Sequence, residues 1–105
     1  MKKYIKANHD FDYDIGGNDP ADWYIDYDGF FEAIEYAIEA LSLEIEDFND
    51  EETIGGRICT YTLSNGSDLD SYDLETEILH ALADGDILGS ETDIFIQEYI
   101  KDNCM

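Results

Sequence analysis

The residues of this sequence that could support chemistry are carboxylates, because 27 Asp and Glu stand against five Lys and Arg in 105 residues. A pair of carboxylates can hydrolyse a glycosidic bond or hold a magnesium ion. With so many acids, some pair always lies within reach, so pairing alone does not indicate an enzyme. The sequence has no Gly-rich phosphate loop with its Lys, no Cys/His set at metal-ligand spacing, and no Ser or Cys nucleophile near a His. We therefore expect a protein that is not an enzyme and that uses no cofactor.

Three aspartates at alternate positions, Asp10, Asp12 and Asp14, match the opening of a calcium-binding loop. Such a loop also needs Gly at its sixth position and Glu at its twelfth. Counted from Asp10, these two positions hold Ile15 and Ala21, so the motif fails at both. We expect a diffuse attraction of cations and no specific metal site.

The acids become regular in residues 28–41, where the sequence predicts an amphipathic α-helix. Apolar residues recur there at steps of three and four, and we expect them to be buried: Phe30, Ala33, Ile34, Ala37, Ile38 and Leu41. The opposite face carries an acidic stripe without a base: Asp28, Glu32, Glu35 and Glu39. Like charges four residues apart cost on the order of 0.2–0.5 kcal/mol per pair, and one Lys would reverse that effect. A stripe that stays negative at this cost indicates a basic partner.

A predicted β-hairpin precedes this helix. Residues 3–15 alternate with period two, residues 16–20 form a turn cluster, and residues 22–28 alternate again. We expect one hairpin over residues 3–27 that leads directly into the helix. Its solvent-facing side carries further acids: Asp10, Asp12, Asp14, Asp22 and Asp26. If both elements form, the hairpin acids and the acidic stripe can make one negative ridge.

The rest of the chain predicts one further strand and at least one further helix. Residues 57–63 are rich in β-branched and aromatic residues, which favours a strand. Residues 72–84 indicate a helix that Asp70 or Ser71 can cap and that Gly85 can end.

Residues 43–48 fit a helix or a strand, and so do residues 92–102, for which we favour a helix. The charge run 49–52 is expected to be a solvated loop. Together the elements predict a single α+β domain over residues 1–105. In it, two or three helices pack on a small, mainly antiparallel sheet that contains the hairpin and strand 57–63.

Cys59 and Cys104 are the only cysteines, and two thiols without an apolar signal core indicate a reduced, cytosolic setting. We expect Cys59 to be buried in its strand, Cys104 to be exposed near the C-terminus, and His80 to be half-buried beside the second helix stripe. No apolar run approaches the roughly 18 residues of a membrane span. We therefore expect a cytoplasmic protein.

The net charge of −22 determines which class of partner the protein attracts. It repels nucleic acid and anionic membranes, and it attracts basic surfaces. Acids step by ~6.6 Å along a strand face and by about 5–6 Å along the helix stripe. Both steps are comparable to the gap between successive phosphates of a DNA strand, which exceeds their axial rise of ~3.4 Å. We expect this surface, with Tyr24 and Tyr36 as additional contacts, to enter the basic groove of a nucleic-acid-binding protein.

In its size, charge and acid spacing the chain resembles the small acidic inhibitors that phages and mobile elements carry against host defence, the DNA-mimic anti-restriction and anti-CRISPR proteins. The resemblance implies a non-enzymatic inhibitor that acts by occupying a nucleic-acid site, in the host cytoplasm if a phage encodes it. Two other classes fit the same charge. One is an acidic antitoxin or nuclease-immunity protein that blocks a basic toxin, and the other is an acidic adaptor for another basic protein.

Overall fold

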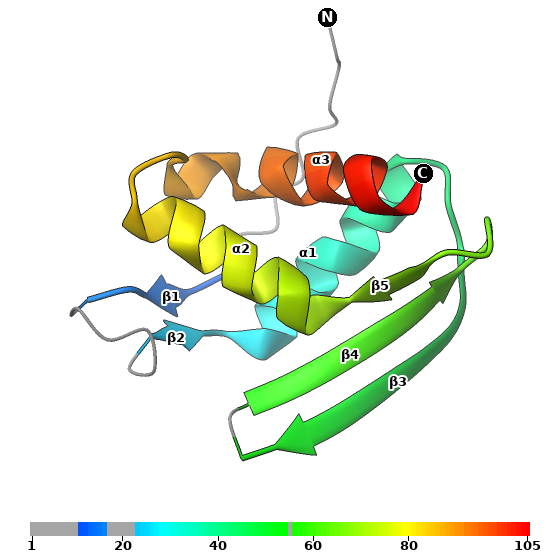
Figure 1. Cartoon of the computed structure of the whole chain (residues 1–105), viewed down its shortest axis with the longest axis horizontal. Coiled ribbons are helices and arrows are strands. Elements are labelled where there is room, and N and C mark those ends of the chain that lie inside the picture. The colour runs from blue at the N-terminus through cyan, green and yellow to red at the C-terminus, as the bar shows by residue number, and fades with distance from the viewer. Residues whose placement is uncertain (1–10, 17–22, 55) are drawn as a thin grey trace, which may run out of the picture.

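In a computed structural model, which describes residues 11–16, 23–54 and 56–105, two small antiparallel sheets and three α-helices form an α+β fold (Figure 1). The elements follow in this order: β1 (Tyr13–Asp14), β2 (Tyr24–Ile25), α1 (Tyr27–Ala40), β3 (Ile45–Thr53), β4 (Gly56–Leu63), β5 (Asp68–Asp70), α2 (Ser71–Ala83), the 3-10 helix η2 (Gly89–Glu91) and α3 (Thr92–Cys104). β1 pairs with β2, and the other sheet has the order β3-β4-β5. The predicted fold class is confirmed.

The helices and the three-stranded sheet enclose the hydrophobic core together. α2 packs on β4, and α3 packs on both α1 and α2. α1 begins next to β2 and ends near the loop that leads into β3 (Figure 1). All of the helices and β4 contribute large side chains with almost no exposed surface: Phe30, Ile34, Tyr61, Leu63, Ile78, Ile96 and Ile100. The core therefore fixes α1 against the sheet, and with it the acidic stripe.

Five of the six residues predicted to form the apolar face of α1 are buried, and Phe31 is buried in addition. The buried residues of α1 are Phe30, Phe31, Ala33, Ile34, Ala37 and Ile38. Leu41 was expected to be buried but is only half-buried. The reason is that the helix ends at Ala40, and the chain then turns away at Ser42 with a positive φ of 61°.

α2 begins and ends where its sequence signals predict. The Asp70 carboxylate accepts a hydrogen bond from the backbone N–H of Tyr72 at 2.9 Å, which caps the first turn. Gly85 adopts a φ of 77° just beyond the last turn, in the left-handed region that favours glycine. The two segments that fit either a helix or a strand have different structures. Residues 92–102 belong to the helix α3, whereas residues 45–48 belong to the strand β3.

The charge run 49–52 is a strand and not the solvated loop that we expected. It lies in the second half of β3, where Asp50 lies opposite Cys59 and Glu52 lies opposite Arg57. The partner strand β4 supplies the backbone hydrogen bonds, and no property of the charge run itself reveals such a partner. Because β3 is exposed from Glu46 onward, it also lacks the alternation that marks a half-buried strand.

The predicted hairpin appears as the β1–β2 pair but does not join the main sheet. Its register places Tyr13 opposite Ile25 and Asp14 opposite Tyr24. The remainder of the hairpin prediction lies outside the described residues. The expectation of one sheet containing the hairpin and strand 57–63 is wrong, because β3 and β5 occupy both edges of β4.

Three predictions about single residues have mixed outcomes. Cys59 is buried, as expected. Cys104 is buried too, contrary to our expectation, because α3 continues to this residue and Asn65 donates a hydrogen bond to its carbonyl. His80 is exposed and not half-buried, because it lies on the solvent side of α2, where its ring packs edge to face with Trp23 at 5.0 Å between centroids.

Glu75 of α2 is half-buried and hydrogen-bonded to the hydroxyl of Tyr27. Burial raises the pKa of Glu75, and the Tyr27 hydroxyl opposes that rise only in part. The folded protein therefore holds a proton that the unfolded chain releases, so stability falls as pH rises above the ordinary Glu value of about 4.3. We expect Glu75→Gln, which keeps an acceptor for Tyr27, to raise the Tm at neutral pH. This gain should shrink as the pH is lowered towards the ordinary Glu value.

Thermal unfolding followed by circular dichroism at neutral and at mildly acidic pH measures this effect. Glu77→Gln is the matched control, because it removes the same charge from an exposed position on the same helix. Equal gains in Tm from both variants would show that the burial of Glu75 is not the cause.

Candidate acidic interface

The acidic stripe of α1 lies in solvent, opposite the buried face of the helix. Asp28, Glu32, Glu35 and Glu39 are all exposed. They therefore stand together along α1, as the helical spacing predicts. Tyr36, on the same helix, is half-buried.

A second group of acids was missed because residues 49–52 were expected to be a loop. The acids from the lead-in of β3 to its end are all exposed: Glu44, Glu46, Asp47, Asp50, Glu51 and Glu52. Directly opposed residues of an antiparallel pair share one face of the sheet. Asp50 lies opposite the buried Cys59, so it faces the helices, whereas Asp47 lies opposite Thr62 on the other face. The second group of acids can be identified only when the pairing of β3 with β4 is known.

The stripe and the second group meet across a groove between α1 and the start of β3. Glu35, Ile38 and Glu39 line its α1 side, and Leu43, Glu44 and Ile45 line its other side. The groove has a volume of about 350 Å³. Ile38 is buried while Leu43 and Ile45 are half-buried, so the floor is apolar and the carboxylates stand at the rim. We call this the α1–β3 groove.

Arg57 of β4 interrupts the acids near the start of α1. Its guanidinium contacts Asp28 at 2.8 Å and Asp50 at 2.6 Å, and it lies 5.2 Å from the centroid of the Phe31 ring. Both carboxylates raise the pKa of Arg57 further above its ordinary value. The stripe contains no base of its own, but the fold brings one to Asp28. The carboxylates of Glu35 and Glu39 lie further along α1, at the α1–β3 groove.

We use the term acidic face for the acidic stripe of α1 together with Glu44 and Asp50. The groove connects Glu35 and Glu39 to Glu44, and Arg57 connects Asp28 to Asp50. These contacts show that carboxylates from two elements lie side by side. A surface of this kind attracts cations and basic proteins.

The described hairpin acids lie on the β1–β2 pair and at the start of α1. Asp12 and Asp14 are exposed, and the Asp14 carboxylate accepts a hydrogen bond from the backbone of Gly16 at 2.8 Å. Asp26 is half-buried at the N-cap of α1. Asp10 and Asp22 lie outside the described residues. Figure 1 shows β2 leading directly into the start of α1, and the β1–β2 pair forms a sheet separate from β3-β4-β5. The expected ridge of hairpin acids and acidic stripe stays a prediction.

Exposed apolar side chains accompany the acids on β2 and β3. Tyr24 of β2 is 56% exposed, as its proposed role in partner contacts requires. Sequence patterns did not identify Phe48, which is 63% exposed, or Ile54, which is fully exposed after β3. Phe48 lies opposite Tyr61, so it projects on the same face of the sheet as Asp50. It could therefore add an apolar contact beside the acidic face.

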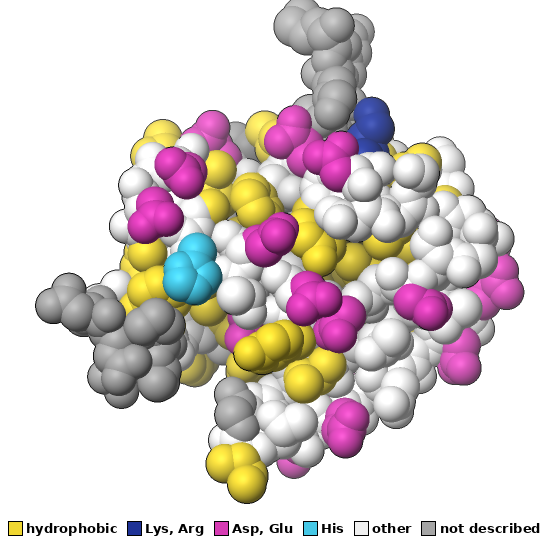
Figure 2. All heavy atoms as spheres, in the orientation of Figure 1, with side chains coloured by type: hydrophobic (Ala, Val, Ile, Leu, Met, Phe, Trp, Pro, Cys, Tyr) yellow, Lys and Arg dark blue, Asp and Glu magenta, His cyan; other side chains and the backbone are white. Residues whose placement is uncertain are grey.

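Acids are not confined to the acidic face. Figure 2 shows Asp and Glu side chains scattered over the side of the molecule that carries α2 and α3. Net charge alone therefore does not locate an interface, and the groove between the two acidic elements is the more specific feature. Among the described residues, no three His, Cys, Asp or Glu side chains gather closely enough to hold a metal ion.

No helix in the described part of the chain combines the length and the apolar character that crossing a membrane requires. Comparisons of the chain with protein-family models, with curated proteins and with solved structures gave no match.

Proposed function

We propose that this protein is a non-enzymatic inhibitor that occupies the basic nucleic-acid-binding site of another protein. It would act as a DNA mimic of the anti-restriction or anti-CRISPR type, in the cytoplasm of the cell in which that partner works. One observation carries the proposal: exposed carboxylates of α1 and of the lead-in to β3 line the two sides of one groove. The partner in this proposal is a protein, since the net charge of −22 repels nucleic acid itself.

The spacing of the acids supports mimicry over a general attraction. Successive acids of the stripe stand three or four residues apart on a helix, which corresponds to about 5–6 Å along its axis. A basic groove built for phosphates can meet such a row with several of its bases at once. The core holds α1 in place, so the row is ordered before binding and little conformational entropy is lost on association.

The first experiment identifies partners and tests competition. The tagged protein is immobilised and exposed to the heparin-binding fraction of a bacterial lysate, which is rich in nucleic-acid-binding proteins. Captured proteins are purified, and their binding is measured with and without duplex DNA or RNA at fixed ionic strength. We expect the nucleic acid to displace the protein competitively. A stable ternary complex with the nucleic acid would contradict mimicry and would favour the antitoxin or adaptor class.

The second experiment localises the contact. We expect Glu35→Lys with Glu39→Lys to weaken binding of the captured partner by roughly tenfold or more, because both charges line the α1–β3 groove. The control is Asp84→Lys with Asp86→Lys, which makes the same change in net charge at exposed positions after α2. Circular dichroism checks that both double variants fold. Equal losses from the two would leave only a general acidic attraction and would refute the assignment of the site.

A further inference from the structure

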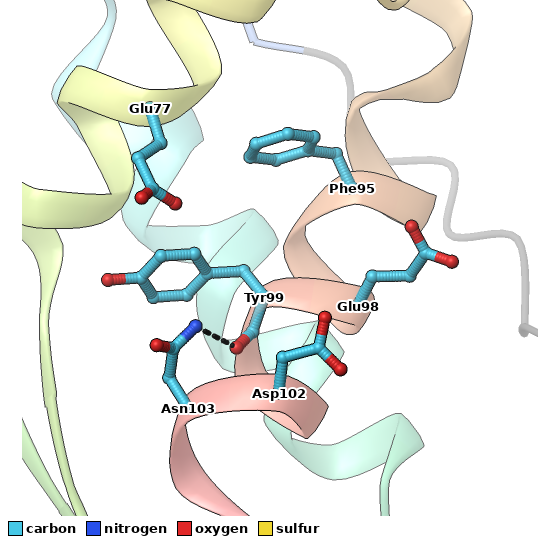
Figure 3. A pocket seen from close by; sticks show the side chains of 6 residues that line it. All are labelled: Glu77, Phe95, Glu98, Tyr99, Asp102 and Asn103. Carbon is cyan, nitrogen blue, oxygen red and sulfur yellow. Dashed lines mark hydrogen bonds between the residues drawn. The ribbon is translucent and has the colours of Figure 1, made fainter.

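A second pocket lies between α2 and α3, away from the α1–β3 groove. Figure 3 shows its lining: Glu77 from α2, with Phe95, Glu98, Tyr99, Asp102 and Asn103 from α3. Its volume is about 170 Å³. None of these residues belongs to the acidic face, so the pocket is a separate feature of the surface.

Two aromatic rings form one wall of this pocket. Phe95 and Tyr99 are four residues apart on α3, a spacing that places both side chains on one face of the helix. Both are half-buried. In Figure 3 the two rings extend from α3 towards α2, and the Glu77 carboxylate approaches the space between them from α2. The Asn103 amide donates a hydrogen bond to the Tyr99 carbonyl at 2.8 Å, so this donor is already engaged by the backbone.

The electrostatics of the pocket favour a cation. Three of its lining side chains are carboxylates, those of Glu77, Glu98 and Asp102. The faces of aromatic rings carry partial negative charge and attract cations as well. Burial raises the pKa of Tyr99, and Glu77 and other nearby acids raise it further. The phenol therefore stays protonated and neutral at physiological pH, and it acts as a ring and not as an anion.

The combination of rings and carboxylates selects the kind of cation. A small hydrated metal ion prefers a shell of oxygen ligands, which two ring faces do not supply. An arginine guanidinium is planar and weakly hydrated, stacks on aromatic rings, and can donate several hydrogen bonds to carboxylates at the same time. A lysine ammonium is more strongly hydrated and does not stack.

We propose that the pocket between α2 and α3 binds the guanidinium group of an arginine side chain from a protein partner. The guanidinium stacks against Phe95 or Tyr99 and donates hydrogen bonds to the Glu77 carboxylate. Charge complementarity argues for a protein partner, because a chain with a net charge of −22 attracts proteins rich in arginine and lysine. This inference does not rest on the proposed function, since the pocket and the acidic face share no residue.

The test uses N-acetyl-arginine N-methylamide as the probe, titrated into the isotope-labelled full chain and followed by NMR. We expect amide shifts around residues 77 and 95–103, and an upfield ring-current shift of the methylene protons next to the guanidinium. N-acetyl-lysine N-methylamide, which has the same net charge, should bind roughly three- to tenfold more weakly because it cannot stack. Tetramethylammonium, which has no hydrogen-bond donor, should also bind more weakly than the arginine probe. Equal binding of the arginine and lysine probes, or tighter binding of tetramethylammonium, would overturn the proposal.

Variants distinguish binding of the arginine probe in this pocket from a general attraction to the negative charge of the protein. We expect Glu77→Gln and Phe95→Leu each to weaken binding of the arginine probe by roughly three- to tenfold, and Phe95→Leu also to reduce the upfield shift. Asp73→Asn is the matched control, because Asp73 is an exposed acid one turn before Glu77 on α2 and does not line the pocket. Glu77 is exposed, so its variant tests the proposal even if Phe95→Leu fails to fold. Equal effects of Glu77→Gln and Asp73→Asn, or shifts centred on the α1–β3 groove, would refute the site.

Discussion

Ile34→Ala is expected to lower the free energy of unfolding by roughly 2–5 kcal/mol, the range typical of large-to-small changes in a packed core. Ile34 has no exposed surface and lies in the middle of α1, on the face that packs into the core. Removing most of its side chain leaves a cavity that the surrounding helices can fill only in part. Because α1 carries the acidic stripe, this residue links the stability of the core to the position of the carboxylates.

Urea denaturation at constant ionic strength measures the loss. Ile54→Ala is the matched control, because it makes the same chemical change at a side chain that is fully exposed after β3. We expect that control to change the free energy of unfolding by less than about 0.5 kcal/mol. A similar loss from both variants would contradict the buried position of Ile34.

The thermal midpoint should rise with NaCl, by at least ~5 °C between low and molar salt. Acids that repel one another at a net charge of −22 destabilise the folded state. Salt screens the repulsion between charges that lie more than a Debye length apart, and this length falls from about 10 Å at 0.1 M to about 3 Å at 1 M. A gain of about 1 kcal/mol corresponds to a shift of this size in a domain of about 100 residues. The neighbouring carboxylates of Glu35, Glu39 and Glu44 illustrate the cause, since they line one groove.

Scanning calorimetry over a series of NaCl concentrations checks this expectation. Calcium and magnesium chloride at low concentration serve as controls for specific ions. A midpoint that is constant over the salt series would show that the repulsion is already neutralised. A large rise with calcium alone would instead indicate a calcium site, which the sequence pattern after Asp10 does not complete.

The helices could be predicted because the signals that define them are local. The period of apolar residues predicts the buried face of α1 with two differences: Leu41 is only half-buried, and Phe31 is buried although it was not predicted to be. Asp70 and Gly85 mark the two ends of α2 by their own chemistry, a carboxylate cap and a left-handed turn. Each of these signals acts over a few residues, so the sequence alone contains it.

β3 could not be predicted because its stability comes from another part of the chain. Its acids have low strand propensity, and its exposure removes the alternation that marks a strand. The pairing of Asp50 with Cys59 and of Glu52 with Arg57 forms only when β4 is in place. Cys104 is similar, because it is buried beside a distant segment, whose Asn65 lies 39 residues away and donates a hydrogen bond to the Cys104 carbonyl.

The candidate interface was therefore predicted in part. The acidic stripe follows from helical spacing, and all four of its carboxylates are exposed. The groove beside it depends on the turn at Ser42, whose positive φ directs the chain from α1 into β3. The pairing of Arg57 with Asp28 and Asp50 depends on the same arrangement of α1, β3 and β4. Contacts between distant segments of this kind have no signature in local sequence.

The edge of β3 that is unpaired among the described residues affects whether two copies of the chain can associate. In the described part of the chain, β3 pairs with β4 along one edge, and no strand pairs with its other edge. A long free edge of this kind is normally a template for pairing with a second copy, which can lead to fibres. Two β3 strands brought edge to edge would oppose rows of carboxylates on both sides, and like charges in such positions repel. The acids of β3 therefore oppose edge-to-edge pairing of two copies, and we expect substitutions that neutralise several of them to increase self-association.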